Sequence, residues 1–419
     1  MTTADRRENR PPTFVAVLRT PRFLPVFTAN ALSMWGDYIA RVTIAAVVFE
    51  RTRSPLATAT TFAISLLPSF FGRSLLGPLV DRIPYKRVLI SAHLTRALCV
   101  VGLVLLVQGQ SSLWEIFGVL FVLEAVGGAA SASNQVLYTD LFEDRRLYAR
   151  SVGLRAMTEQ VNQAIGLAVG GGLVALLGPR AGLLLDLATF VVAAVVIAVV
   201  VELRPVQGER GLGLSGFVRD LGDAVGDLVR HPVLARLVLL GACATLAIAA
   251  PEALGIPIAG ENGWGGALMA APIIGAVAGI ALISRCDVQR QNRLIVPLAL
   301  AMPLPLTLTA LYPPTIVVAL LFFASGMLQA FMVPLQSTFA LVTMPALRGR
   351  VYSLAGAVSV ACAGGSFLAA GWLGQHTDPH LGVAISAGAC LALLAIASFS
   401  WPHRGMQAAV ERVYTDPPL

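Results

Sequence analysis

The chain is poor in charge. Of its 419 residues, 13% are Asp, Glu, Lys or Arg and 56% are hydrophobic, whereas soluble domains carry about 25% charged residues. The mean hydropathy is +0.76. This composition excludes an ordinary soluble protein and predicts a chain that lies largely in a membrane.

Several kinds of functional site are missing as well. The only lysine is Lys86, and the chain has no Gly-x-x-x-x-Gly-Lys-Ser/Thr loop, which argues against a pump driven directly by ATP. The arginines form no basic face with interleaved aromatics, so nucleic-acid binding is not indicated despite the net charge of +7. No enzyme site and no cofactor site stands out.

Metal sites and disulfides are not indicated either. The five cysteines stand singly, with no CxxC pair, and are expected to be small packing residues. His376 and His380 flank Asp378 in a loop, a pattern that predicts a solvated turn rather than a metal site. The N-terminal segment is polar and arginine-bearing, so we expect no cleaved signal peptide.

Long hydrophobic runs make up most of the chain. Each has roughly 20 residues, the length at which a helix crosses a bilayer. The runs predict an all-α membrane protein with twelve transmembrane helices, at 23–49, 55–80, 87–108, 112–138, 150–178, 180–201, 236–259, 264–285, 294–311, 314–340, 351–374 and 380–401.

Lys and Arg are distributed unevenly between the loops. When both termini are placed on one side, all but seven of the 30 Lys and Arg residues fall in the terminal segments and in the loops after even-numbered spans. Short loops rich in Lys and Arg remain cytoplasmic. The sequence therefore predicts a multi-pass protein of the cytoplasmic membrane with both termini in the cytoplasm.

One long polar segment separates the first six spans from the last six. Within it, Phe217, Leu221, Val225 and Leu228 recur at helical spacing, which predicts an amphipathic helix on the membrane surface. The predicted domains are an N-terminal six-helix bundle at 1–201, a cytoplasmic connecting loop at 202–235 and a C-terminal six-helix bundle at 236–419.

The two predicted bundles resemble each other weakly. The segment "NQVLYTDLFEDRRLYARSVGL" at the end of the fourth span aligns with "LQSTFALVTMPALRGRVYSL" at the end of the tenth, so that Gln135 falls against Gln336. Internal duplication of a helical bundle is typical of secondary transporters, whose binding site lies between the repeats near the bilayer midplane. The sequence thus favours a pseudo-symmetric transporter.

The segment "GPLVDRIPYKR", residues 77–87, lies in the loop between the second and third spans. Its Gly-x-x-x-Asp-Arg-x-x-x-Lys-Arg pattern resembles the loop motif of the major facilitator superfamily, although a proline stands at position 84, where that family usually has glycine. The resemblance covers essentially the whole chain. It implies a cytoplasmic gate formed by Gly77, Asp81, Arg82, Lys86 and Arg87.

Further segments resemble one branch of this superfamily. The stretch from Phe23 to Arg82 is similar to the opening of the drug and siderophore exporters, which include macrolide efflux proteins and the enterobactin exporter. "LLLDLATF" around Asp186 and "LRGRVYSL" around Arg350 are similar to segments of the same branch. This resemblance implies export by alternating access and proton antiport.

Charged residues also lie within the predicted spans. Insertion of each into the bilayer costs about 2.5 kcal/mol or more, so each needs an oppositely charged partner or a function. Asp37 lies near mid-depth of the first span. Arg41 follows one helical turn later on the same face, so we expect the two to form a structural or gating ion pair. Glu124, in the middle of the fourth span, has no basic residue within reach on its own helix.

Other intramembrane charges are expected to line the cavity or its gates. Arg155 and Glu159 form a second pair with four-residue spacing, in the inner half of the fifth span. Asp186 in the sixth span and Glu252 in the seventh either meet across an outer gate or reach water. Arg96 lies closer to the cytoplasm, within snorkelling reach of it.

A proton carrier is a carboxylate whose protonation changes when the site changes its access. Glu124 fits best, because nothing near it in the sequence neutralises it; substrate contact and a satisfied buried acid remain alternatives. Asp37 and Glu159 are the other candidates. A charged N-terminal bundle that faces an apolar C-terminal bundle suits an amphiphilic substrate plus a proton.

The predicted function is export of a hydrophobic or amphiphilic small molecule, such as a drug, natural product or siderophore, against protons. We expect a monomer in the lipid bilayer. One alternative is a flippase of the same fold for a lipid or lysophospholipid. Another is a sensor or scaffold that transports nothing, although the short tails leave little room for a signalling domain.

Overall fold

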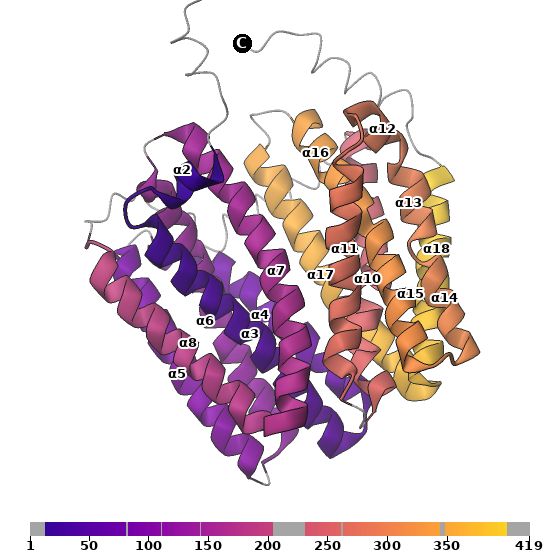
Figure 1. Ribbon diagram of the computed structural model, residues 1–419, viewed down its shortest axis with the longest axis horizontal. Helices are drawn as coiled ribbons and strands as arrows, with labels where there is room; N and C mark the ends of the chain where they lie inside the picture. The colour runs from indigo at the N-terminus through magenta and orange to yellow at the C-terminus, as the bar shows by residue number, and fades with distance from the viewer. Residues whose placement is uncertain are drawn as a thin grey trace, which may run out of the picture.

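The computed structural model describes residues 13–80, 83–109, 111–142, 144–203, 231–260, 263–343 and 348–399. Every regular element in these ranges is a helix (Figure 1). Within a bilayer, backbone N–H and C=O groups find no water, and a helix pairs them within one segment. The all-α prediction is therefore confirmed.

The first set of helices, called the N-terminal helices below, runs from α3 to α8. A short helix, α2 (Phe14–Leu18), precedes it. The set comprises α3 (Phe23–Thr52), α4 (Pro55–Val80), α5 (Tyr85–Gln108), α6 (Leu113–Leu141), α7 (Arg145–Leu177) and α8 (Pro179–Val200).

The second set, called the C-terminal helices, runs from α10 to α18 and contains several short pieces. It comprises α10 (Pro232–Ala259), α11 (Gly265–Ile283), α12 (Val288–Arg293), α13 (Ile295–Ala301), α14 (Leu304–Thr307), η1 (Leu308–Leu311), α15 (Thr315–Leu328), η2 (Gln329–Phe331), α16 (Met332–Val342), α17 (Arg348–His376) and α18 (Pro379–Phe399). The predicted amphipathic helix at 217–228 lies outside the described residues.

Ten helices in the described ranges are long and apolar enough to cross a membrane. Helix α4, with 26 residues, is not among them. Nor is the segment Ile295–Leu311, whose apolar helical stretch is shorter than a full span. The predicted count of twelve spans therefore stays a prediction, while several membrane crossings are shown.

Prolines explain why the predicted ninth span is broken and why the tenth contains a tightened turn. A proline inside a helix removes one hydrogen bond and its ring clashes with the preceding turn. Helix α13 ends at Ala301, just before Pro303, and the chain continues through α14 and η1. The tenth segment passes through the tight turn η2 three residues before Pro334.

The two sets of helices lie side by side in Figure 1, with α2, α12 and α16 at the same end. They meet where α4 packs on α17 and α7 packs on α11. The Phe62 and Phe367 rings stack across this boundary with centroids 5.5 Å apart. Gly171 and Gly266 bring two backbones together: a Cβ added to Gly171 would lie 2.6 Å from the Gly266 Cα.

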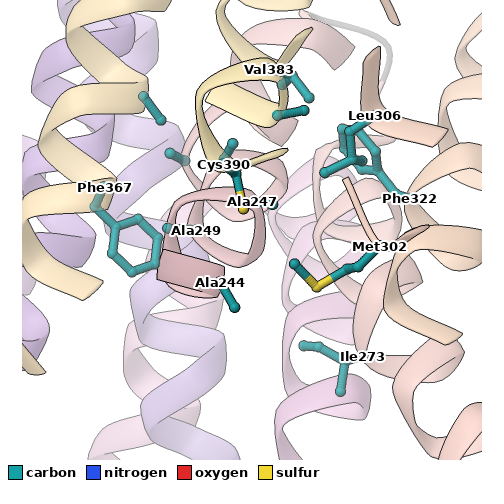
Figure 2. Packing of buried hydrophobic residues seen from close by; sticks show 14 of the residues in the cluster. Ala244, Ala247, Ala249, Ile273, Met302, Leu306, Phe322, Phe367, Val383 and Cys390 are labelled. Atoms are coloured by element: carbon teal, nitrogen blue, oxygen red, sulfur yellow. The ribbon is translucent and has the colours of Figure 1, made fainter. Parts of the chain in front are cut away.

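The largest buried cluster fills the C-terminal helices and the boundary with the N-terminal ones. Figure 2 shows small residues of α10, such as Ala244 and Ala247, beside larger side chains from α11, α15, α17 and α18. Small residues let helices approach closely inside a membrane. Large apolar side chains such as Leu98, Val199 and Ile396 are instead exposed on the outer faces, as lipid contact requires.

Candidate functional site

A polar cavity of about 340 Å³ lies among the N-terminal helices α3 to α7. Five of the seven intramembrane charged residues predicted as site residues line it: Asp37, Arg41, Glu124, Arg155 and Glu159. Asp186 and Glu252 do not. The sequence therefore identified most of the charged lining, although not its pairing.

Helix α3 contributes the longest part of the lining. Asn30, Met34, Asp37 and Arg41 follow one another at intervals of three or four residues, so they form one stripe along the helix. The opposite stripe, with Ile39 and its neighbours, is buried apolar surface. This periodicity turns the polar stripe of α3 toward the cavity.

Arg41 forms an ion pair with Glu124 of α6. The Arg41 Nη2 lies 3.2 Å from the Glu124 Oε1, and the Arg41 Nε also donates to that oxygen at 3.3 Å. The Glu124 side chain is 4% exposed and that of Arg41 is 23% exposed. Glu124 is thus neutralised by a residue distant in sequence, on another helix, which the search for a basic residue near it in the sequence could not find.

Asp37 pairs with Arg96 of α5, and not with Arg41. The Arg96 Nη2 donates to the Asp37 Oδ1 at 2.7 Å, and the guanidinium lies over the Phe190 ring of α8, 4.3 Å from its centroid. The predicted Asp37–Arg41 pair is therefore wrong. Residues four apart share a helix face, but here each turns to a different neighbouring helix.

Arg96 also departs from its predicted position. Its side chain is 7% exposed and points into the interior, so it does not snorkel toward the membrane surface. Two contacts of the guanidinium explain why Arg96 stays buried. The Asp37 carboxylate compensates its charge, and the aromatic face of Phe190 stacks with the planar guanidinium.

Arg155 and Glu159 both line the cavity, yet no ion pair between them occurs in the described part of the chain. Arg155 lies over the Tyr138 ring, 3.9 Å from its centroid. Glu159 is exposed. The predicted pairing within α7 is therefore replaced by a contact between Arg155 and α6.

Amide side chains connect the helices around the cavity. Asn134 of α6 donates to the Asn30 Oδ1 of α3 at 3.0 Å, and Asn162 of α7 donates to the backbone oxygen of Ala31 at 2.7 Å. Such interhelical hydrogen bonds are worth about 0.6 kcal/mol on average inside membranes. They hold the polar stripe of α3 against α6 and α7.

Asp186 and Glu252 lie in different places and do not meet. Asp186 is fully buried, with the hydroxyl of Thr189 3.5 Å from its Oδ1. Glu252 of α10 accepts a hydrogen bond from the Gln163 Nε2 of α7 at 3.2 Å. Neither predicted alternative, a meeting across an outer gate or contact with water, holds for Asp186.

Glu252 lines a second cavity of about 130 Å³ between the two sets of helices. Gln160 and Gln163 enter it from α7, and the remaining lining comes from the C-terminal helices. That part is mainly apolar, with Ser325 and Gln329 as further polar residues. The expected asymmetry between a charged and a mostly apolar side is thus visible in the two cavities.

The predicted gate motif is only partly described. Gly77 lies in α4, and Asp81 and Arg82 fall outside the described residues. The Lys86 Nζ donates to the backbone oxygen of Ala198 in α8 at 2.7 Å, and Arg87 is exposed in the first turn of α5. The tight entry into α5 is made at position 84, the N-cap of that helix.

His93 lines the cavity and was not singled out from the sequence, as is also true of Asn30, Met34 and Asn134. It is buried one turn before Arg96 on α5, and its Nδ1 has no hydrogen-bond partner. The signal available in the sequence was the three-residue spacing of two polar side chains within an apolar span. That spacing places them on one helix face.

Comparison with known proteins identifies the fold. A family model for the Major Facilitator Superfamily matches residues 26–369. Curated protein sequences give no match. Among solved structures, a POT family transporter in complex with 5-aminolevulinic acid is similar with a TM-score of 0.69 and 11% identity, over 95% of this chain and 99% of that chain.

Two further solved structures are similar to this chain in fold. The nucleoside transporter NupG is similar with a TM-score of 0.66 and 14% identity, over 90% of this chain and 98% of that chain. A bacterial homologue of the iron transporter ferroportin, in an inward-facing state, is similar with a TM-score of 0.64 and 17% identity, over 93% and 99%. At these identities the likeness concerns the fold.

The family model reaches from α3 to α17 and thus spans most of the helices described above. The apolar helices that can cross a membrane agree with it. The chain therefore belongs to the Major Facilitator Superfamily and is a multi-pass membrane transporter rather than an enzyme.

Proposed function

We propose that the chain is a secondary active transporter that exports hydrophobic or amphiphilic small molecules in exchange for protons. The observation that carries this proposal is the asymmetry of the two cavities. One is polar and lined only by N-terminal helices, and the other has a mainly apolar lining from the C-terminal helices. A molecule with one polar and one apolar end matches both linings.

Transport proceeds by alternating access between the N-terminal and C-terminal helices, which we propose as two domains. A close backbone contact between them, at Gly171 and Gly266, lies near the end of α7 and the start of α11. With both termini in the cytoplasm, as the distribution of basic residues predicts, this contact closes the outer end of the path. The gate at residues 77–87 then opens and closes the inner end.

Protons are carried by acids around the polar cavity, with Glu124, Asp37 and Glu159 as the candidates. Glu124 and Asp37 each have an arginine partner from another helix. An ion pair that opens when cargo or a proton arrives couples the two events, because the freed carboxylate takes up the proton. Lipid and siderophore cargo remain compatible with the same chemistry.

The similar solved structures do not select a cargo. They include a nucleoside transporter, a transporter in complex with 5-aminolevulinic acid and a homologue of an iron transporter. The molecules and ions in these descriptions differ in charge, size and polarity, although the fold is shared. We therefore infer the cargo class from the cavity lining of this chain.

The test uses the purified chain in liposomes with an imposed pH gradient. We expect the gradient to drive accumulation of an amphiphilic fluorescent cation, and Asp37→Asn to abolish it. Glu115→Gln, which removes an exposed acid in the first turn of α6, is the control and should transport normally. Absence of dye movement together with a change of leaflet by labelled lysophospholipid would instead establish the flippase.

A further inference from the structure

We infer that Asp37 and Asp186 share the guanidinium of Arg96 and a single proton, so that the carboxyl group not paired with Arg96 is the protonated one. Asp186 is then a proton-holding residue behind the wall of the polar cavity. Its use in transport rests on the proposed exchange of cargo for protons, whereas its protonation can be measured without transport.

Asp186 is a buried acid without an ionic partner. Its exposed fraction is 0%, and no cation forms an ion pair with it in the described part of the chain. Its Oδ1 lies 3.5 Å from the Thr189 hydroxyl, which donates at 2.7 Å to the backbone oxygen of Asp186 instead. Its Oδ2 has no hydrogen-bond partner. An isolated buried carboxylate of this kind becomes neutral rather than remain charged.

Asp186 lies directly beside the Asp37–Arg96 pair. A Cβ added to Gly36, the residue before Asp37, would be 2.6 Å from the Asp186 Oδ1, so Asp186 packs against α3 at this point. Phe190, one turn after Asp186 on α8, lies beneath the Arg96 guanidinium. Asp37 and Asp186 therefore approach the same guanidinium from α3 and from α8.

The unpartnered atoms of this cluster complement each other. Arg96 uses its Nη2 for Asp37, while its Nε has no partner. The Asp186 Oδ2 likewise has none. A guanidinium has five N–H donors and can serve two carboxyl groups in turn. A rotation of the Arg96 side chain that keeps its stacking on Phe190 thus brings a free donor toward a free acceptor.

Among the residues whose side chains the structure describes, Arg96 is the cation that remains available to Asp186. Arg41 of α3 is engaged with Glu124 of α6. His93, on the same face of α5 as Arg96, is buried with its Nδ1 unpartnered and its ring centroid 6.0 Å from that of Phe190. The cluster therefore contains two carboxyl groups for one guanidinium.

The proposed exchange conserves charge and protons. In the observed arrangement Arg96 pairs with ionised Asp37, and Asp186 carries the proton. When Arg96 moves to Asp186, the O–H bond of Asp186 breaks and the proton passes to Asp37, which lines the cavity. The side chain of Asp37 is 18% exposed, so the proton leaves from there to cavity water.

The experiment is infrared spectroscopy of the purified chain at neutral pH, without cargo or gradient. We expect the C=O band of a protonated carboxyl group in the wild type and its loss in Asp186→Asn. Asp37→Asn should also remove most of this band, because Arg96 is then free to pair with Asp186 and ionise it. Asn mimics the neutral acid in shape, so we expect both variants to fold.

Two control variants make the assignment specific. Glu115→Gln removes an exposed acid, and Glu124→Gln removes a buried acid that is already paired with Arg41. Both should keep the band. A wild-type spectrum without a band that depends on Asp186, or an unchanged band in Asp37→Asn, would overturn the inference. Failure of gradient-driven transport with the band present would reject proton antiport and leave the shared guanidinium intact.

Discussion

Arg41 of α3 forms its ion pair with Glu124 of α6, and not with Asp37 one turn earlier on its own helix. The pair therefore holds two helices together, whereas a pair within α3 would hold none. Asp37 in turn joins α3 to α5 through Arg96. The charged stripe of α3 thus connects this helix to α5 and to α6.

Removal of one partner of the Arg41–Glu124 pair should destabilise the folded chain. We expect Glu124→Gln and Arg41→Gln each to lower the free energy of unfolding by roughly 2–5 kcal/mol, because the remaining charge is left without its partner. The effect should lie toward the lower end, since the cavity screens Arg41. Thermal unfolding in detergent measures it, and the double variant should cost less than the sum. Additive effects would contradict the pairing.

Replacement of Arg96 by lysine should not preserve its role. An ammonium group cannot stack on the Phe190 ring as the planar guanidinium does, nor keep the same directed hydrogen bonds. We expect Arg96→Lys to destabilise the chain by about 1–2 kcal/mol. Arg19→Lys, at an exposed position, is the matched control and should change stability by less than about 0.5 kcal/mol. Equal melting temperatures for the two variants would refute the stacking argument.

A side chain at the contact between Gly171 and Gly266 should hold the two sets of helices apart. A Cβ on Gly266 would lie 2.5 Å from the backbone oxygen of Leu167, which cannot move aside as a flexible side chain would. Overpacking costs about 1–3 kcal/mol, so Gly266→Ala should disfavour the closed end about fivefold or more. We expect a matching loss of transport in liposomes.

Gly172 offers the control for that experiment. It is adjacent to Gly171 in α7, but a Cβ added to it would meet nothing within 4 Å. Gly172→Ala should therefore keep full transport and gain roughly 0.5–1 kcal/mol of helix stability. Equal loss of transport in the Gly172 and Gly266 variants would show that helix flexibility, and not contact, matters.

The carboxylate of Glu252 should select cargo by charge. It lies in the second cavity with amide neighbours and accepts one hydrogen bond, from Gln163. In the described ranges no cation pairs with it. We expect Glu252→Gln to reduce transport of a cationic dye about tenfold while a neutral analogue of similar size loses much less, a difference of about 1.4 kcal/mol. Ser325→Ala, in the same cavity, should reduce transport of both dyes to a similar extent.

Most of the fold could be predicted, because hydrophobic length and loop charge reflect the bilayer directly. The predicted span at 55–80 coincides with α4, and that at 87–108 differs from α5 by two residues at its start. The segment 294–311 was predicted as one span and is divided between α13, α14 and η1. Pro303 indicates this break in the sequence. The span was predicted from hydropathy, which does not take into account that proline interrupts a helix.

The site could be predicted only as a set of residues. Sequence spacing correctly placed Asp37 and Arg41 on the face of α3 that lines the cavity. Their partners depend on which helices become neighbours, and that depends on packing over the whole bundle. For this reason neither the Glu124 pair nor the burial of Arg96 followed from local spacing.

The contact between Lys86 and Ala198 gives the chain an unusual chemical property. Lys86 is its only lysine, and its Nζ is engaged with the backbone of α8 at one end of the bundle. Amine-reactive reagents therefore have one side-chain target, whose reactivity rises when this contact opens. The acylation rate of the Lys86 side chain, measured during transport, would follow the movement of α5 against α8 without an introduced residue.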